Sequence, residues 1–568
     1  MSQIAGQSFV PSDFDPSSYA NIEPLGEDLL KRPLDTPEQL QQWIVDASDF
    51  FSVIHEFGSR RNIDYACHTN DGDIEQAYLH WVRDLQPQLS PLFFELQKHY
   101  LASPALKQVD ADPGLAIMHK EWLADVETFR TANVPLETQL TELNSEYDKT
   151  MGAMEVEFKG ETYTLQQMGK FLEDTDRDTR QQAWQLSTDR RMAAREKVDA
   201  IFEKMLDLRH RIAENAGFDN FRDYTWESRH RFDYTPEHCQ TFADGVAAVC
   251  MPLVEQLDVE RKKKLNLDVL RPWDSGVDPD NKPPLKPFDP ADIDTFVAKT
   301  RTIFDRISPE LGRQFATLAE NNNLDLDSRK GKRPGGFQAA LQASKQPFIF
   351  MNAAGLQRDV ETLVHEGGHA FHFLASCDME NLFVRHAPLE FCEVASMGME
   401  LIAADHYDVF YDSPEDAARA KHTQFEGIAR KLTWIAVIDG FQHWLYTHPG
   451  HSAEQRTAAW LEILNRFSSS QIDWTGLEEP RAAMWQRQLH LFHVPFYYIE
   501  YGIAQIGAMQ VWQNYHKDPE RTLSQLLEAF ALGGTRPLPE LFETAGAKFD
   551  FSEANLRPLI EAVSAELR

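Results

Sequence analysis

The sequence predicts a mainly helical protein that carries one small β-sheet near its middle. Most of the first 260 residues place apolar side chains at the three- and four-residue spacing of amphipathic helices. Strand-like segments are few and short: one hairpin at 154–165 and one run at Gln346–Asn352. The 568 residues are 42% hydrophobic and 26% charged, which excludes a disordered or fibrous protein.

Threonine–proline pairs mark two of the predicted helix starts, because threonine caps a helix and proline fits its first turn. The first pair, Thr36-Pro37, precedes apolar residues at helical spacing, and Thr235-Pro236 repeats the signal. Similar apolar patterns begin at Asp73, Asn133 and Asp176.

Alternation of apolar and acidic residues at 154–158, followed by Lys159-Gly160, predicts a small hairpin in this helical half. Residues 271–290 then contain six prolines, too many for a helix. Both an interdomain linker and an ordered connection fit this segment. A helical pattern resumes at 290–311, and we predict an N-terminal helical lobe at 1–200 and a catalytic lobe at 201–568.

The charge balance bears on the partners of the protein. With 56 Lys and Arg against 89 Asp and Glu, the formal net charge is −33, which disfavours binding to nucleic acid or anionic membranes. The five cysteines include no CxxC pair, so neither a disulfide framework nor a cysteine zinc site is indicated. With no secretory signal and no apolar run of membrane-spanning length, we expect a cytoplasmic protein.

Catalytic chemistry is indicated by the HExxH segment at 365–369. On a helix, His365 and His369 lie on one face and can direct both imidazoles at a single ion. Glu366 lies beside them, placed to take a proton from a metal-bound water. This pattern is typical of zinc metallopeptidases.

A catalytic zinc takes a third protein ligand. Glu390, Glu393 and Glu400 follow on the next predicted helix, and spacing alone leaves both Glu390 and Glu393 possible. His372 also shares the ligand face, but we expect it to pack beside the site, because a fourth protein ligand would leave no open position. A metzincin is excluded, since it needs glycine at position 372 and histidine at position 375.

Several motifs in order resemble the thimet oligopeptidase-like (M3) metallopeptidases, especially the bacterial oligoendopeptidase F and Pz-peptidase branch. The resemblance rests on the segments Arg329–Gly336, Pro347–Asn352, Arg358–Leu363, His365–His372, Glu393–Ser396 with Glu400, and Pro495–Gln505. One departure is Gly367, where many members carry a bulky residue. It replaces no ligand.

The resemblance implies a large two-lobed helical metallopeptidase that encloses a deep substrate channel, with a small β-sheet beside the active-site helix. It also implies one Zn²⁺ per chain, bound by His365, His369 and Glu393, with Glu400 next to the ligands.

A cluster of phenols and imidazoles at 487–501 can supply the donors that a developing oxyanion needs. By resemblance, His490, Tyr498 and Tyr501 contact the substrate carbonyl, with Tyr497 and His493 as rivals. The resemblance further implies that the strand with Phe348, Met351 and Asn352 pairs with the substrate backbone.

These observations predict a zinc-dependent endopeptidase that hydrolyses internal bonds of short, unstructured peptides, as a monomer or small homo-oligomer. A zinc carboxypeptidase, with Arg358 or Arg487 binding the free carboxylate, and a non-catalytic peptide-binding relative are the alternatives. The basic loop at Arg329–Arg333 is expected to receive a peptide carboxylate, whereas the overall negative charge would favour neutral or cationic peptides.

Overall fold

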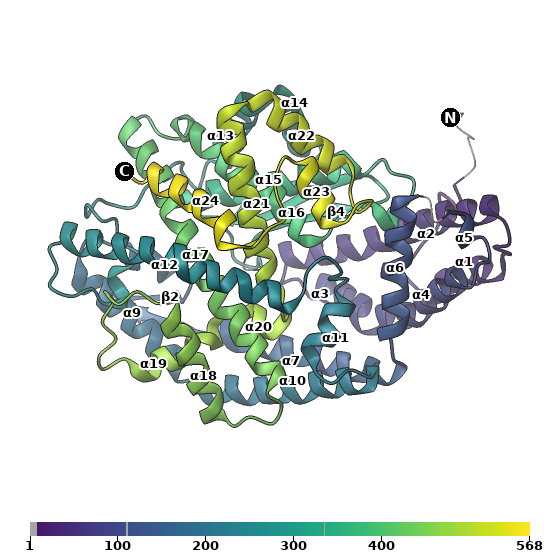
Figure 1. Cartoon of the computed structure of the whole chain (residues 1–568), viewed down its shortest axis with the longest axis horizontal. Helices are drawn as coiled ribbons and strands as arrows, with labels where there is room; N and C mark the ends of the chain where they lie inside the picture. The colour runs from purple at the N-terminus through teal and green to yellow at the C-terminus, as the bar shows by residue number, and fades with distance from the viewer. Residues whose placement is uncertain (1–7, 110–111, 334) are drawn as a thin grey trace. The chain divides into compact units, whose positions relative to one another are not determined.

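The computed structural model describes residues 8–109, 112–333 and 335–568, and it is mainly helical (Figure 1). The chain forms two compact units, each assembled from three separate stretches. Unit 1 comprises 1–129, 286–421 and 507–549, and unit 2 comprises 130–285, 422–506 and 550–568. Helices α17 (Pro414–Thr447) and α21 (Tyr498–Lys517) each contribute residues to both units.

Unit 1 contains a helical layer and the three-stranded sheet. Apart from its parts of α17 and α21, its elements are α1 (Tyr19–Lys31), α2 (Pro37–Cys67), α3 (Gly72–Leu79), η1 (His80–Leu85), α4 (Gln86–Leu101), α5 (Leu106–Val109), α6 (Pro113–Thr128), α13 (Ile293–Ile307), α14 (Pro309–Glu320), β3 (Leu324–Asp327), β4 (Phe337–Leu341), β5 (Gln346–Ala353), α15 (Gln357–Ser376), η4 (Leu382–Val384), α16 (Leu389–Ala403), η5 (Ala404–Val409), α22 (Pro519–Ala531) and α23 (Leu538–Thr544). Trp43 and Phe50 of α2 lie in an apolar core shared by α1, α4, α6 and η4.

Unit 2 is helical apart from one hairpin. Its other elements are η2 (Thr131–Asn133), α7 (Val134–Gly152), β1 (Glu155–Phe158), β2 (Glu161–Thr164), α8 (Gly169–Leu172), α9 (Arg177–Met192), α10 (Arg195–Ala216), α11 (Phe221–Ser228), α12 (Pro236–Lys264), η3 (Pro272–Asp274), α18 (Ala453–Arg466), α19 (Glu478–Ala482), η6 (Met484–Arg487), α20 (Leu489–His493) and α24 (Glu553–Glu566).

The local signals read from the sequence produce the expected elements. Thr36 caps α2 through a capping box with Gln39, and at the start of α12 the backbone N–H of Thr235 donates to His238 Nδ1 at 3.0 Å. The predicted hairpin is confirmed as β1 and β2. Its turn residues, Lys159 and Gly160, both have positive φ, as a tight hairpin turn requires.

The sheet in unit 1 has the order β3-β5-β4, with β3 parallel and β4 antiparallel to β5. The predicted strand at Gln346–Asn352 is therefore confirmed as the central one. Phe350 and Ile349 of this strand pair with β3 on one side and β4 on the other. The expectation that this strand pairs with the substrate backbone is wrong for residues 349 and 350, because β3 and β4 already occupy both of its edges there.

The proline-rich segment is an ordered connection where it begins. Asp274, at the end of η3, is fully buried and accepts hydrogen bonds from Arg177 Nε and Arg180 Nη2, both at 3.0 Å. The backbone N–H of Arg271 donates to the same carboxylate at 2.9 Å. This single side chain ties the segment to α9.

The predicted boundary at residue 200 falls within α10, inside unit 2. Because the chain returns twice to each unit, no division in sequence order coincides with them. The two lobes and the channel between them stay predictions. Among the described residues, no helix combines the length and the apolar character needed to cross a bilayer.

Asp274→Asn should lower the free energy of unfolding by about 3 kcal/mol, because two guanidinium groups lose their buried counter-ion. Burial alone would raise the pKa of Asp274, but the hydrogen bonds from Arg177, Arg271 and Arg180 hold it below the ordinary 3.8. A lowered folded-state pKa means that this stabilisation is present above about pH 4 and is lost as the pH falls through the folded pKa. Urea unfolding at pH 7 and below pH 4 measures both effects.

Asp280→Asn is the matched control, since Asp280 and Lys264 form an exposed ion pair at 3.2 Å. It should change the unfolding free energy by less than about 1 kcal/mol. Equal losses in the two variants would contradict the role given to Asp274.

Candidate metal centre and aromatic site

Helix α15 presents the HExxH residues from the end of the central strand. Asp359 anchors its start, because one carboxylate oxygen accepts hydrogen bonds from the backbone N–H groups of Ala354 at 2.7 Å and Leu356 at 2.9 Å. From this capped start, His365 and His369 follow one turn apart, with ring centroids 4.9 Å from each other. The helix and its ligand face agree with the sequence prediction.

Three side chains converge as a candidate metal site. One ligand atom from each of His365, His369 and Glu393 lies within 4.8 Å of the others. Glu393 Oε2 lies 3.4 Å from His365 Nε2 and 3.6 Å from His369 Nε2. Two imidazoles and one carboxylate are a donor set that suits zinc and leaves a coordination position open.

Glycine at position 368 allows Glu393 to reach both histidines. A Cβ added to Gly368 would lie 2.6 Å from Ser396 Cα and 2.7 Å from Ala395 O, which are backbone atoms of α16. Helices α15 and α16 therefore approach more closely here than any side chain permits. Ser396 adds a hydrogen bond of 3.0 Å to Glu393 Oε2, which orients the carboxylate.

Glu400 orients the first histidine. His365 Nδ1 donates to Glu400 Oε1 at 2.6 Å, which directs Nε2 toward Glu393 and His369. Burial alone would lower the pKa of His365, but the hydrogen bond and charge of Glu400 raise it to about 9. Burial lowers the pKa of His369, so its imidazole is neutral, as a metal ligand must be.

Glu366 is buried beside the ligand set and packs against the sheet. Its side chain is 6% exposed, and the backbone N–H of Gln338 in β4 donates to its carboxylate. Burial is the largest influence and raises the pKa of Glu366 to about 7. A carboxyl group with such a pKa can accept and return a proton near neutral pH.

The remaining candidates on these two helices lie outside the cluster. His372 is buried and stacks on Phe530 with ring centroids 4.9 Å apart, consistent with the predicted packing role. Glu390 is buried on α16 but does not belong to the ligand group. At Gly367, a Cβ would meet the Phe304 ring at 2.6 Å, so Phe304 fills the space that a side chain at this position would need.

The aromatic residues near the C-terminus gather within unit 2. The His490 ring centroid lies 4.8 Å from that of Tyr498 and 5.9 Å from those of Tyr497 and Tyr501. His493 Nε2 instead forms a hydrogen bond of 2.9 Å with Asp148 Oδ1. The structure therefore groups His490 with all three tyrosines, and we call this group the aromatic site.

A hydrogen-bond chain sets the tautomer of His490. Trp434 Nε1 donates to Gln488 Oε1 at 2.9 Å, which leaves Gln488 Nε2 to donate to His490 Nδ1 at 2.8 Å. Since Nδ1 accepts, the proton of the neutral imidazole is on Nε2. His490 can thus act as a hydrogen-bond donor without being charged.

Buried arginines hold the backbone of the aromatic site. Arg209 donates to the carbonyls of Leu491, at 2.9 Å, and Phe492. Arg231 donates to the Phe496 carbonyl and to Glu500 at 2.6 Å. Sequence analysis missed these arginines, because nothing in helical spacing distinguishes a buried arginine from a surface one.

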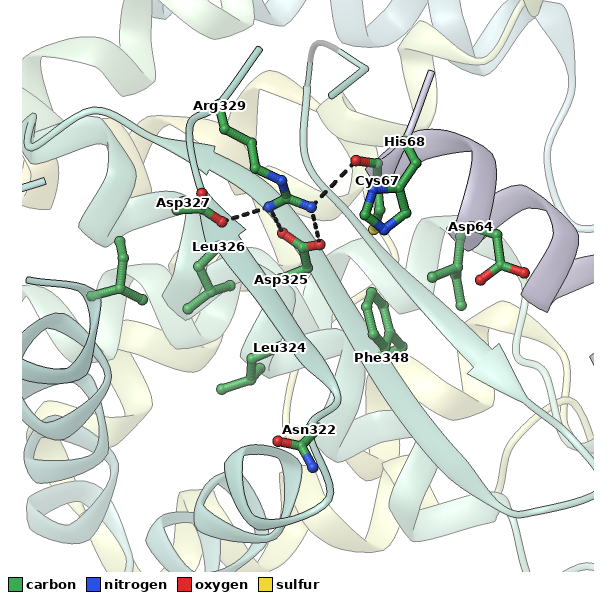
Figure 2. A pocket seen from close by; sticks show the side chains of 12 residues that line it. Asp64, Cys67, His68, Asn322, Leu324, Asp325, Leu326, Asp327, Arg329 and Phe348 are labelled. Carbon is green, nitrogen blue, oxygen red and sulfur yellow. Dashed lines mark hydrogen bonds and ion pairs between the residues drawn. The ribbon is translucent and has the colours of Figure 1, made fainter. Parts of the chain in front are cut away.

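Two cations of the basic loop at Arg329–Arg333, Arg329 and Lys332, are paired with acidic residues of the protein. Figure 2 shows Arg329 beside a cavity of 530 Å³, where its guanidinium bonds Asp325, Asp327 and the Cys67 carbonyl. Lys332 is fully buried and donates to Asp325 at 2.6 Å. The expectation that this loop binds a peptide carboxylate is therefore wrong for Arg329 and Lys332.

The three strand residues assigned to substrate differ in their surroundings. Phe348 lines the same cavity (Figure 2), Met351 is buried, and Asn352 Nδ2 donates to the carbonyls of Arg333 and Gly335. Their contact with substrate stays a prediction.

The fold and the residues on α15 and α16 are those of a helical peptidase, and comparison with known proteins assigns the family. The sequence model of peptidase family M3 matches residues 170–290 and 304–559. The chain belongs to peptidase family M3.

Individual relatives agree with this assignment. An oligoendopeptidase F homolog of Mycoplasma pneumoniae is 21% identical over 488 residues, covering 79% of this chain and 75% of its own. A solved structure of PZ peptidase A with an inhibitor superposes with a TM-score of 0.91 at 25% identity, covering 98% of this chain and 99% of that one. Oligoendopeptidase-F from Enterococcus faecium shares the fold, with a TM-score of 0.61 at 15% identity and 96% coverage of each chain. The predicted family and mainly helical fold class are confirmed.

Gly368→Ala should weaken both folding and metal binding, because the new methyl group collides with the α16 backbone. Overpacking of this kind costs about 1–3 kcal/mol of unfolding free energy. Separation of α15 from α16 would also move Glu393 away from the imidazoles and lower the affinity for Zn²⁺. Urea unfolding and competition with a chelator measure the two effects.

Gly427→Ala is the control, since a Cβ at Gly427 in α17 meets nothing within 4 Å. It should raise the unfolding free energy by about 0.5–1 kcal/mol and leave metal affinity unchanged. A Gly368→Ala protein with native stability and zinc affinity would show that the close approach is not needed.

Proposed function

We propose that this protein is a zinc-dependent endopeptidase that hydrolyses internal bonds of short, unstructured peptides. The observation that carries the proposal is the convergence of His365, His369 and Glu393 next to the buried Glu366. Membership of peptidase family M3 and likeness to oligoendopeptidase F and PZ peptidase A support it.

The residues of the metal centre would divide the work between binding and proton transfer. His365, His369 and Glu393 would hold one Zn²⁺, which supplies Lewis acidity when bound. Glu366 would take a proton from the attacking water and pass it to the leaving amine, a use that suits its pKa of about 7. Ser396 and Glu400 would keep the ligands in orientation.

The aromatic site would stabilise the negative charge that develops on the carbonyl oxygen. His490 Nε2–H and the hydroxyls of Tyr498 and Tyr501 are the donors proposed for it. His490 suits this role because Gln488 keeps its proton on Nε2. Tyr497 shares the ring cluster and stays a candidate, whereas the pairing of His493 with Asp148 disfavours it.

We further propose that the enzyme acts in the cytoplasm on peptides alone, without nucleic acid or membrane partners, and as a monomer or small homo-oligomer. The net charge of −33 supports the exclusion of polyanionic partners. Digestion of a mixed pool of short peptides, with intact casein as the negative control, tests the substrate class. Cleavage of intact protein at a rate comparable to peptides would contradict it.

Zinc content should be one ion per chain and should fall to nearly none in His369→Ala, since two protein ligands rarely retain zinc. His448→Ala, at an exposed histidine, is the control and should keep the full complement. Elemental analysis after gel filtration gives the ratio. Zinc that persists in His369→Ala would overturn the assignment and direct attention to Cys239, Asp439 and His443 in unit 2, a second group able to bind a metal.

Glu366→Gln should retain zinc and lower kcat by about 100- to 10,000-fold, because an amide cannot accept the proton. Glu380→Gln, at an exposed glutamate shortly after α15, should be unaffected. Turnover of an internally quenched peptide together with zinc content distinguishes loss of the base from loss of the metal. A Glu366→Gln enzyme near the native rate would exclude Glu366 as the general base.

A further inference from the structure

Unit 2 contains a cavity of 460 Å³ that has no role in the proposed mechanism. Its volume lies in the range of small-ligand sites. Residues from α9, η3, α17 and η6, and from the loops after α18, form its walls. Most of the lining is aromatic or aliphatic, including Trp184, Trp434 and Trp474, and three arginines and one aspartate supply its charge.

One of these arginines is neutralised by acidic residues of the protein. Arg430 Nη2 lies 2.7 Å from Asp258 and 3.0 Å from Glu426. Its charge is therefore balanced on the cavity wall. The positive charge available to a ligand in the cavity therefore comes from the other two arginines, Arg191 and Arg487.

Arg191 and Arg487 have no such counter-ion. Neither guanidinium forms a hydrogen bond or ion pair with any residue in the described parts of the chain, and Arg191 Nε is buried without a partner. Arg487 lies over the Trp434 ring at 5.6 Å and remains accessible to solvent. In a chain of net charge −33, two unpaired arginines that face one cavity are conspicuous.

The two arginines destabilise each other's charge. Desolvation by the protein around the cavity, followed by the positive charge of Arg191, lowers the pKa of Arg487 to about 10. Burial lowers the pKa of Arg191 as well. Both remain protonated at neutral pH, so an anion bound between them would relieve the repulsion between the two guanidinium groups.

The cavity adjoins the aromatic site. Arg487 is next to Gln488, which bonds His490 and Trp434, and Trp434 also lines the cavity. The charge of Arg487 also acts on Tyr498. A ligand in the cavity would thus lie close to the residues proposed to contact the scissile carbonyl.

We propose that Arg191 and Arg487 bind the C-terminal carboxylate of the peptide substrate. Guanidinium groups pair with carboxylates through two parallel hydrogen bonds, and the tryptophan walls suit the apolar parts of the last residues. This inference rests on the proposed peptidase function and names its substrate class more narrowly: peptides with a free C-terminus.

Binding of the C-terminal carboxylate at a fixed place predicts which peptide bond is cleaved. If the carboxylate is fixed beside the aromatic site, the number of residues after the scissile bond is set by the protein and not by the peptide sequence. Peptides extended at the N-terminus should keep their cleavage site, and peptides extended at the C-terminus should shift it by the number of residues added.

The first experiment uses the native enzyme with a ladder of N-acetylated peptides of four to ten residues, each as the free acid and as the C-terminal amide. We expect kcat/KM to be about 10- to 100-fold higher for the acids, mainly through KM, because the carboxylate is bound equally in ground and transition states. A third set, of amides with one internal glutamate, tests whether a side-chain carboxylate can replace the C-terminal one. Products are assigned by mass spectrometry.

The second experiment removes the cations one at a time. Arg487→Gln and Arg191→Gln should each lower kcat/KM for acids toward the value for amides and leave the amides unchanged. Arg487→Lys should keep part of the preference, since the charge remains without the paired geometry. Arg190→Gln is the matched control, because this neighbour on α9 lies outside the cavity lining and its loss should change neither value.

A binding measurement separates this inference from the proposed catalysis. In Glu366→Gln, quenching of tryptophan fluorescence by a peptide acid, and not by its amide, reports on the cavity walls without turnover. Such binding with no cleavage by the native enzyme would overturn the peptidase mechanism and leave the carboxylate site standing. Release of single C-terminal residues would make the enzyme a carboxypeptidase with the same anchor.

Three results would overturn the inference itself. Acids and amides could be cleaved and bound equally by the native protein, or the preference for acids could survive in both glutamine variants. Internal-glutamate amides could replace the acids fully, which would assign the cavity to an acidic side chain. Circular dichroism and thermal unfolding of every variant ensure that the comparison is made between folded proteins.

Discussion

The candidate metal centre depends on how closely two helices approach each other at Gly368. Helix α15 carries both histidines and α16 carries the glutamate, so the ligand set exists only where their backbones meet. The absent side chain at Gly368 permits that distance, and Ala395 and Ser396 occupy the space. A glycine within a helix costs about 1 kcal/mol relative to alanine, a cost that the geometry of the site offsets.

Around this contact, buried polar groups leave the ligands little freedom. Glu400 holds His365, Ser396 holds Glu393, and the sheet edge at β4 places a backbone donor on Glu366. The aromatic site in unit 2 is also held by buried polar contacts. Gln488 orients His490, Arg209 bonds the backbone carbonyl of Leu491, and Arg231 bonds Glu500. In both places the reactive side chains are positioned by a near neighbour in sequence, Ser396 or Gln488, together with partners from more distant parts of the chain.

The charges divide into those satisfied within the fold and those left for a ligand. The basic loop looked like an anion site in the sequence, yet Asp325 and Asp327 neutralise Arg329. Arg191 carried no such signal, and Arg487 entered the sequence analysis only as one of two candidates in the carboxypeptidase alternative. These two are the pair that the fold leaves without a counter-ion in a cavity. Whether a cation is available for substrate is decided by its neighbours in space and not by the basic residues beside it in sequence.

Features set by neighbours in sequence were accessible without the structure. Thr36-Pro37, the turn at Lys159-Gly160 and the HExxH spacing each act over a few residues, so the helix starts, the hairpin and the two histidines of one helix face could be predicted, as could the helical fold class. Spacing could not choose between Glu390 and Glu393, because that choice depends on how α16 lies against α15; only the resemblance to a known family selected Glu393.

The tertiary structure alone decided which groups meet. It made the predicted strand the centre of its sheet, so both edges of residues 349 and 350 are taken by neighbouring strands. It also separated His493 from the aromatic site, paired the basic loop internally and left two arginines facing a cavity. Some of these contacts join residues a few positions apart, as Arg329 and Asp325 do, and others join residues hundreds of positions apart, as His493 and Asp148 do. Burial and counter-ions, which control charge and reactivity, exist only after those contacts form.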